Sequence, residues 1–244
     1  MINSILHKAN TRGGADMGWL NAKHSFSFSN YYDPKRMNFG VLRVLNDDII
    51  GAGTGFGTHP HDNMEIITIP TEGDLAHKDS MGNGTTIKTG DIQVMSAGTG
   101  IQHSEQNPNH DKQTKLFQIW LFPNKQNVTP RYQQISLNME DKKNNLLQIL
   151  SPNPDDAGVW IHQDAWFHLG KLDKDFSIDY DLKRKGNGIY AFVVSGDFSV
   201  ENQQETQELS QRDALGMWET SKITIKATSE NAEILLLEVP MQVN

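Results

Sequence analysis

The chain has 244 residues, with 22 lysines and arginines against 30 aspartates and glutamates, for a formal net charge of −8. This length suits one large β domain or two of moderate size, and the acidic balance argues against direct nucleic-acid binding. The absence of cysteine excludes disulfides and thiolate metal sites. Because the chain shows neither a signal peptide nor a transmembrane-length apolar run, we expect a cytoplasmic protein that does not bind membranes.

Short apolar segments, separated by glycine, asparagine and aspartate, follow one another along the whole chain. Their valine, isoleucine, threonine and aromatic residues predict β-strands, and helical periodicity over ten residues is hard to find. In chain order the clearest expected strands cover 39–45, 64–70, 91–97, 115–122, 188–196, 214–219, 222–227 and 232–240. So many short strands are typical of an all-β barrel or sandwich. The basic segment 181–188 reads as a solvated turn between two of them.

The order of features in the first half of the chain returns in the second half. A Gly-Asp pair follows an apolar strand at Gly73 and again at Gly196, and a further aspartate lies at a similar distance downstream, at Asp91 and Asp213. This weak internal repeat predicts two similar β domains. The predicted division is an N-terminal domain at 1–135, a polar linker at 136–158 and a C-terminal domain at 159–244.

Two pairs of candidate metal ligands lie in the N-terminal half. Residues two apart on a strand share a face, so an extended segment 59–67 would place His59, His61 and Glu65 together. His103 and Glu105 form a second pair with the same spacing. On facing strands the two pairs would supply three imidazoles and one or two carboxylates, a donor set that suits iron, manganese, nickel, copper or zinc.

The segments that carry these residues resemble a known family. "GTGFGTHPHDNMEIITIPTEG" (53–73) is similar to the first cupin motif, and "GDIQVMSAGTGIQHSE" (90–105) is similar to the second. The second departs from the general pattern, because Ser96 stands where proline is usual and His103 comes two residues late. These departures, together with "HSFSFSNYYDP" (24–34), resemble the pirin family, and within it the short bacterial pirin-like quercetin dioxygenases.

The resemblance implies an all-β bicupin fold with two jelly-roll-like β-barrel domains, of which only the N-terminal one binds metal. The family's metal ligands fall on His59, His61, His103 and Glu105, which leaves Glu65 as a pocket carboxylate. In the rival assignment Glu65 replaces Glu105 as ligand, and Glu105 is the free base. The spacing of the residues does not decide between the two glutamates.

The implied activity is cleavage of a flavonol such as quercetin by O2 with release of CO. The resemblance implies one divalent metal, Fe(II) first, with Mn, Ni, Co, Cu or Zn as alternatives, and Glu105 or Glu65 as the catalytic base. No further cofactor is expected. We expect a monomer whose partners are a flavonoid-like aromatic substrate and O2. The alternative function is an iron-sensing binding or transcriptional co-regulatory protein of the pirin type.

We do not expect the remaining histidines to bind the metal. His162 and His168 lie in the second half, away from any equivalent of the ligand pairs, and are expected to be structural and hydrogen-bonded. We expect His7, His77 and His110 to be exposed, and we assign His24 no ligand role.

Several apolar residues near the histidine pairs are candidates for a substrate pocket above the metal. For each of them the competing interpretation is ordinary packing inside the barrel. The candidates are Phe56, Met64, Met95, Phe117 and Trp120.

Overall fold

The computed structural model describes residues 3–202 and 204–243 of the chain. These residues form β-strands and two short 3-10 helices, η1 (Ala9–Thr11) and η2 (Met139–Lys142), and include no α-helix. No helix in the described ranges is long and apolar enough to cross a membrane. The prediction of an all-β protein is therefore confirmed.

Contacts divide the chain into two compact units, each of which combines segments that are distant in sequence. The N-terminal unit consists of Gly13–Leu137 and Asn153–Gln163, and the C-terminal unit consists of Met1–Arg12, Asn138–Pro152 and Asp164–Asn244. The domain ranges expected from sequence stay a prediction. They differ from the contact units at two places. The segment through Arg12 groups with the C-terminal unit because its strand pairs there, and segment 153–163, which includes the start of the expected C-terminal domain, groups with the N-terminal unit.

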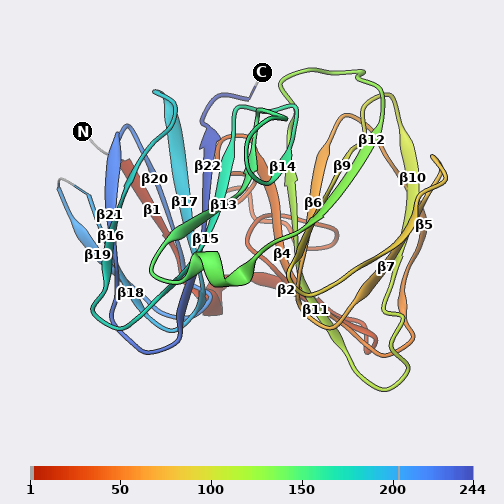
Figure 1. Ribbon diagram of the computed structural model, residues 1–244, viewed down its shortest axis with the longest axis horizontal. Coiled ribbons are helices and arrows are strands. Elements are labelled where there is room, and N and C mark those ends of the chain that lie inside the picture. Colours follow the sequence, from red (N-terminus) through yellow and green to blue (C-terminus); the bar gives the residue numbers. More distant parts are fainter. Residues whose placement is uncertain (1–2, 203, 244) are drawn as a thin grey trace. The chain divides into compact units, whose positions relative to one another are not determined.

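The N-terminal unit is a sandwich of two antiparallel sheets (Figure 1). A seven-stranded sheet has the order β12-β9-β6-β11-β4-β3-β2, and a four-stranded sheet has the order β5-β10-β7-β8. The strands are β2 (Gly13–Asp16), β3 (Leu20–His24), β4 (Leu42–Ile50), β5 (Gly55–His61), β6 (Glu65–Glu72), β7 (Leu75–Asp79), β8 (Gly84–Ile87), β9 (Asp91–Ser96), β10 (Ile101–Gln106), β11 (Thr114–Leu121) and β12 (Arg131–Ser136), with β14 (Val159–Trp160) following later in the chain.

The C-terminal unit repeats this two-sheet plan. In one sheet β1, β20, β17, β22, β15 and β13 are neighbours in that order, and the other sheet has the order β16-β21-β18-β19. The strands are β1 (Asn3–His7), β13 (Leu146–Ser151), β15 (Trp166–Leu172), β16 (Ser177–Asp181), β17 (Asn187–Ser195), β18 (Phe198–Glu201), β19 (Thr206–Leu209), β20 (Ala214–Trp218), β21 (Lys222–Ala227) and β22 (Ala232–Pro240).

The expected strands agree closely with the observed ones, and the basic segment 181–188 connects β16 to β17 as predicted. The main difference is β4, which was expected at 39–45 and extends from Leu42 to Ile50. Phe39 and Leu42 exchange backbone hydrogen bonds of 2.9 Å across a tight turn that contains Gly40 at φ 53°. That turn delays the start of the strand, because its residues cannot be extended.

The internal repeat reflects equivalent turns in the two units. Gly73 and Gly196 adopt φ of 75° and 71°, a left-handed conformation that favours glycine. Downstream, the carboxylate of Asp91 accepts a hydrogen bond from the backbone of Lys88 at 2.9 Å, and Asp213 accepts one from Ser210 at 3.1 Å. Each aspartate thus closes the turn that leads into an inner strand.

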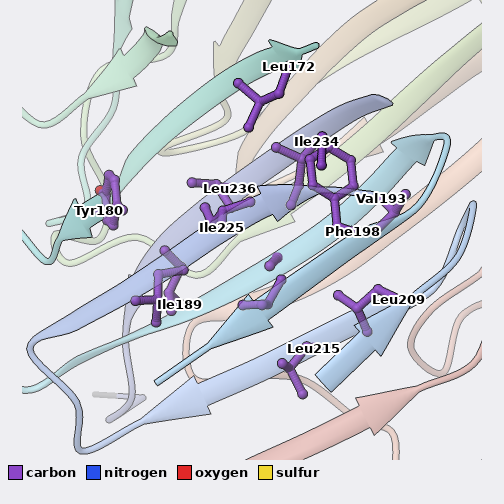
Figure 2. Packing of buried hydrophobic residues seen from close by; sticks show 14 of the residues in the cluster. Leu172, Tyr180, Ile189, Val193, Phe198, Leu209, Leu215, Ile225, Ile234 and Leu236 are labelled. Atoms are coloured by element: carbon purple, nitrogen blue, oxygen red, sulfur yellow. The ribbon is translucent and has the colours of Figure 1, made fainter. Parts of the chain in front are cut away.

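The C-terminal unit buries an apolar core between its two sheets. Figure 2 shows side chains from β16 to β22 directed toward one another, among them Phe198, Val193 and Ile234. All three are fully buried. This packing needs only the period-two alternation of apolar residues along the strands.

Candidate metal centre

Three histidines meet on the inner face of the four-stranded sheet of the N-terminal unit. His103 of β10 lies directly opposite His59 of β5 in the antiparallel pairing. Their ring centroids are 4.4 Å apart, and the ring of His61 lies 4.9 Å from each of them. One nitrogen from each ring lies within 4.8 Å of the others, so the three imidazoles can bind one ion.

The hydrogen bonding of the three rings leaves lone pairs for a metal. His59 Nδ1 lies 2.8 Å from the carbonyl oxygen of Gly57, and because a carbonyl only accepts, Nδ1 carries the proton and Nε2 is free to coordinate. His61 Nε2 and both ring nitrogens of His103 are buried and have no hydrogen-bond partner among the described residues. Such unpartnered buried nitrogens fit a bound cation.

Protonation does not compete strongly for these nitrogens. Burial and the neighbouring ring of His59 lower the pKa of His61 to about 4. Burial, followed by the rings of His59 and His61, lowers the pKa of His103 to about 2. Both rings are therefore neutral at pH 7, which is the form that binds metal.

Glu105 is a buried carboxyl group beside the histidines. It is 2 % exposed and accepts hydrogen bonds from Gln118 Nε2 at 2.8 Å and from Thr68 Oγ1 at 3.5 Å. Burial raises the pKa of this carboxyl group, against the smaller opposing effects of Gln118 and His77. A cation at the centre would favour the ionised form and offset the cost of burying it.

A second candidate ligand group shares two of these residues. His77 of β7 lies opposite Glu105, and a ligand atom from each of His77, His103 and Glu105 falls within 4.8 Å of the others. We expected His77 to be exposed, and this expectation is wrong because the side chain is only 2 % exposed. Its Nε2 lies 3.3 Å from Asp79 Oδ2, and its Nδ1 has no partner in the described part of the chain.

The glycine-rich segment before the histidines allows β5 and β10 to approach closely. A Cβ at Gly55 would lie 2.2 Å from the backbone oxygen of Glu105, so no other residue fits there. The pairing register then shifts between His103 and Glu105, where Glu105 lies opposite Phe56. The extra residue lies in β5, between Phe56 and His59, because β10 pairs regularly with β7 over the same residues.

Glu65 does not join the centre. We expected it on the face of His59 and His61, but the chain is not extended between β5 and β6, where Asn63 has φ 41°. Across the sheet, Ile66 lies opposite Trp120, whose ring is 4.9 Å from that of His61. Ile66 therefore faces the histidines, and its neighbour Glu65 points to the opposite face. The expectation of a shared face is wrong for this reason.

The surroundings of Glu65 are those of a structural carboxyl group. Ser96 Oγ donates to it at 2.7 Å, the backbone of His162 also donates, and Arg131 lies nearby. Burial raises the pKa of Glu65 to about 7 in spite of these partners. Arg131 in turn binds the carbonyl oxygen of Trp160 at 2.6 Å, which ties segment 153–163 to the sheet.

A cavity of about 450 Å³ opens beside the centre. His59, His61 and Glu105 line it, and aromatic side chains form much of its wall: Trp19, Phe28, Phe56 and Trp120. Two of the expected pocket residues, Phe56 and Trp120, are thus confirmed. Met95 and Phe117 do not line this cavity and are fully buried, and Met64 packs in the small core cluster that contains Met95.

A row of polar side chains crosses the seven-stranded sheet near the cavity, and we did not predict it. Cross-strand pairing places each residue opposite the next in the series His24, Asn46, Gln118, Thr68 and Gln93. His24 Nδ1 lies 2.9 Å from Asn46 Oδ1, while Gln118 and Thr68 contact Glu105. The row therefore connects the wall of the cavity to the carboxyl group of the centre.

Asp48 is a further cavity residue that the sequence analysis missed. It follows Asn46 by two residues and lies on the same face of β4, where it is 2 % exposed. Burial raises its pKa to about 8, and Glu105 and Asp47 raise it further by charge repulsion. Asn46 and Asp48 are polar residues at alternate positions of a mostly apolar strand, and this pattern could have identified both as cavity residues from the sequence.

The other histidines lie outside the candidate ligand groups. His110 is exposed as expected. His7 was expected to be exposed, which is wrong, because it is buried with Nδ1 2.8 Å from the hydroxyl of Tyr190. His162 is half-buried against Trp160, and His168 is buried against Tyr180. His168 Nδ1 has no hydrogen-bond partner within the described ranges, so its structural role stays a prediction.

Two cupin-like sandwiches, one of which holds a histidine-rich centre on its inner face, define a metal-binding bicupin. Residues 6–121 match the pirin family, and residues 148–239 match a family described as the quercetinase C-terminal cupin domain. The chain belongs to the pirin family. The predicted family and the predicted jelly-roll bicupin fold are both confirmed.

Similar proteins extend over nearly the whole chain. A protein from Escherichia coli strain K12 named quercetin 2,3-dioxygenase is 42 % identical over 96 % of this chain and 98 % of its own length. A pirin-like protein from Caulobacter vibrioides is 40 % identical over 93 % and 95 %. The crystal structure of the bacterial pirin YhhW from Escherichia coli, in complex with nickel(II), has a TM-score of 0.90 and 41 % identity, with both chains fully covered.

Proposed function

We propose that this protein is a metal-dependent dioxygenase that cleaves a flavonol such as quercetin with O2 and releases CO. The observation that carries the proposal is the cluster of His59, His61 and His103, which shares His103 with a second cluster that contains Glu105. His59, His61 and Glu105 also line a cavity with aromatic walls. A relative that is 42 % identical is named quercetin 2,3-dioxygenase, which supports the reaction class. The cavity volume of about 450 Å³ falls in the range typical of small-molecule sites.

We propose His59, His61, His103 and Glu105 as the metal ligands. The three imidazoles are close together, and the buried nitrogens of His61 and His103 lack partners among the described residues. A three-nitrogen, one-oxygen donor set without sulfur suits a divalent first-row metal. We propose Fe(II), with Mn, Ni, Co, Cu or Zn as alternatives; the related bacterial pirin was solved with nickel(II).

A metal bound at this centre would act as a Lewis acid that favours the ionised form of the flavonol 3-hydroxyl group. In our proposal Glu105 accepts the hydroxyl proton at a carboxylate oxygen. Gln118 supports this role, because its amide holds Oε2 of Glu105 at 2.8 Å and fixes the carboxyl plane. Trp120 and Phe56 would hold the flat ring system and exclude water from it.

Glu65, which we also predicted as a possible base from the sequence, is a poorer candidate than Glu105. Its oxygens bond to Ser96 and to the backbone of His162, on the face of β6 away from the histidines. A general base needs hydrogen-bond reach to the proton that it removes. The geometry therefore favours Glu105. A cytoplasmic location and a monomeric state stay predictions from the sequence.

The decisive experiment follows O2 consumption and CO release by purified protein loaded in turn with each of several divalent metals, with quercetin as substrate. We expect turnover with at least one metal and a large loss of kcat in Glu105→Gln. His162→Ala serves as the matched control and should keep the activity. If the protein binds metal stoichiometrically but no metal supports turnover, the dioxygenase proposal fails and the iron-sensing alternative gains support.

A further inference from the structure

Asp48 is the polar residue of the cavity wall whose hydrogen bonding is left incomplete. Its neighbours on the same face have partners, since Asn46 bonds to His24 and Gln118 bonds to Glu105. Asp48 Oδ1 is buried and has no hydrogen-bond partner in the part of the chain that the structure describes. Asp48 is 2 % exposed and lines the cavity, so its carboxyl group lies beside whatever occupies the cavity.

The strand register places Asp48 away from the end of the cavity beside Trp120 and His61. Asp48 lies opposite Leu116 of β11, whereas Trp120 of the same strand lies opposite Val44. Four residues of strand separate the two rows, which corresponds to about 13 Å. The ring of Trp120 packs against His61. The cavity thus has one end beside Trp120 and His61, and another end where Asp48 lies near enough to Glu105 to be affected by its charge.

The carboxyl group of Asp48 lies beside apolar residues. Opposite Asp48 are Ala22 and Leu116, both members of the core cluster against which Trp19 and Phe56 pack. A buried polar atom without a partner is costly, and natural chains keep such atoms chiefly where they have a function. Packing alone would be served better by a leucine at this position.

We propose that Asp48 determines specificity by forming a hydrogen bond to a second hydroxyl group of an aromatic ligand whose first oxygen lies at the histidines. The ligand class is a flat, polyhydroxylated aromatic molecule long enough to reach both ends of the cavity. This inference rests on the proposed function, because it takes the same cavity as the substrate site. It adds the requirement that the ligand carry a second hydroxyl group, which metal binding alone would not impose.

The raised pKa of Asp48 supports the role without carrying it. Burial is the main cause, and the charges of Glu105 and Asp47 add to it. A neutral carboxylic acid can both donate and accept a hydrogen bond. It is therefore well suited to a phenolic hydroxyl group, which does the same.

The test compares two flavonols that differ in hydroxylation. Quercetin and 3-hydroxyflavone share the ring system and the 3-hydroxyl group, but 3-hydroxyflavone lacks the other hydroxyl groups. Binding to metal-loaded protein without O2 is measured by quenching of tryptophan fluorescence, which Trp19 and Trp120 of the cavity wall should report. Metal content is measured in the same samples. The variants are Asp48→Leu, Asp48→Asn and, as matched control on the other face of β4, Asp47→Asn.

We expect the parent to bind quercetin about tenfold or more tightly than 3-hydroxyflavone, because a site built for a hydroxyl group discriminates against its absence. Asp48→Leu should abolish this preference through weaker quercetin binding, with 3-hydroxyflavone binding and metal content unchanged. Asp48→Asn should retain part of the preference, since an amide still forms a hydrogen bond. Asp47→Asn should behave as the parent.

Three results would overturn the inference while leaving the proposed function in place. These are an unchanged preference in Asp48→Leu, an equal loss of affinity for both flavonols, and a loss of metal from Asp48→Leu, which would make Asp48 a support of the centre. A metal-loaded parent that binds neither flavonol would instead overturn the proposed function, and the role of Asp48 with it.

Discussion

His103 belongs to both groups of candidate ligands, so its substitution has the clearest expected effect at the scale of single residues. It lies between His59 on one neighbouring strand and Asp79 on the other, with Glu105 two positions further along. Both of its nitrogens are buried without partners among the described residues. A histidine in this position has little structural purpose other than to hold an ion or a ligand.

We expect His59→Ala and His103→Ala each to lower metal content from about one ion per chain to a small fraction of it, because a three-histidine site does not tolerate the loss of one imidazole. His162→Ala should leave metal content unchanged, since His162 contacts Trp160 and lies outside the candidate groups. Elemental analysis of the purified variants measures this. Equal metal in His103→Ala and the parent would contradict the assignment.

His77→Ala distinguishes the two ligand groups. If His59, His61 and His103 hold the ion, the variant should keep most of its metal, with an affinity loss of about tenfold from the disturbed surroundings of Glu105. If His77, His103 and Glu105 hold it, metal should be lost as completely as in His103→Ala. Metal titration of both variants decides, and we expect the first outcome because His77 Nε2 is already engaged by Asp79.

Glu65 gives a prediction about pH and stability. Its pKa is raised from 4.5 to about 7 in the folded state, so between these values the unfolded chain loses a proton that the folded chain keeps. Glu65 therefore lowers the free energy of unfolding as pH rises from 4.5 to 7, by at most about 3 kcal/mol, with no further change above pH 7. Below pH 4.5 Glu65 does not lower the free energy of unfolding in this way.

Removing the titrating group should remove this dependence. The unfolding free energy of Glu65→Gln relative to the parent should increase between pH 4.5 and 7, as measured by denaturant unfolding at several pH values. Glu72→Gln, at the exposed end of the same strand, is the matched control, because the Glu72 side chain is 56 % exposed and forms only a surface ion pair with Lys115. A pH-independent difference for Glu65→Gln would contradict the buried environment.

At the scale of elements, the close approach of β5 and β10 forms the centre. The two strands bring His59 opposite His103, and the irregular register places Phe56 opposite Glu105. Gly55 permits this approach, since any Cβ there would clash with the backbone of Glu105. The glycine-rich sequence before the histidine pair thus has a steric purpose.

Gly55→Ala should separate the two strands and disturb the centre. A Cβ 2.2 Å from a backbone oxygen forces the strands apart, and such overpacking typically costs about 1–3 kcal/mol. We expect a lower melting temperature together with weaker metal binding. Gly57→Ala is the matched control, because a Cβ at Gly57 meets nothing within 4 Å. Unaltered metal affinity in Gly55→Ala would show that the close approach is dispensable.

At the scale of the whole molecule, the first strand of the chain completes the C-terminal unit. β1 pairs with β20 from Asn3 to His7, and Lys8 forms an ion pair of 2.7 Å with Asp213. The two ends of the sequence are therefore joined in one sheet. Without β1, the edge of β20 would expose its backbone hydrogen-bonding groups.

A chain that starts at Gly13 should keep its metal and lose stability in the C-terminal unit. We expect the amide protons of β20 to exchange about tenfold faster or more, because they lose their strand partner. Hydrogen exchange measured by mass spectrometry resolves this region, and metal content is the internal control. Unchanged exchange in β20 would show that β1 contributes little.

Much of the fold could be predicted from the sequence because strand patterning is local. The segments 222–227 and 232–240 were expected as strands and are observed with those bounds. The ligand pairs were also visible, since His59 and His61, like His103 and Glu105, repeat with the period of a strand. Period-two alternation depends only on the chain itself.

The failures occur where position depends on a turn or on a distant strand. Glu65 was misplaced because the turn at Asn63 interrupts the alternation that was assumed to continue. His77 was read as exposed because its neighbours in sequence are polar, whereas pairing of β7 with β10 buries it beside Glu105.

The sequence by itself determined an all-β chain with an internal repeat and two ligand pairs, because side chains along a strand alternate whatever surrounds the strand. Only the tertiary structure decided that His59 and His103 face each other, that Glu65 points away, and that Asp48 lines the same cavity. These are relations between strands that lie far apart in the sequence. Cross-strand register sets them, and register follows from the packing of the whole sheet.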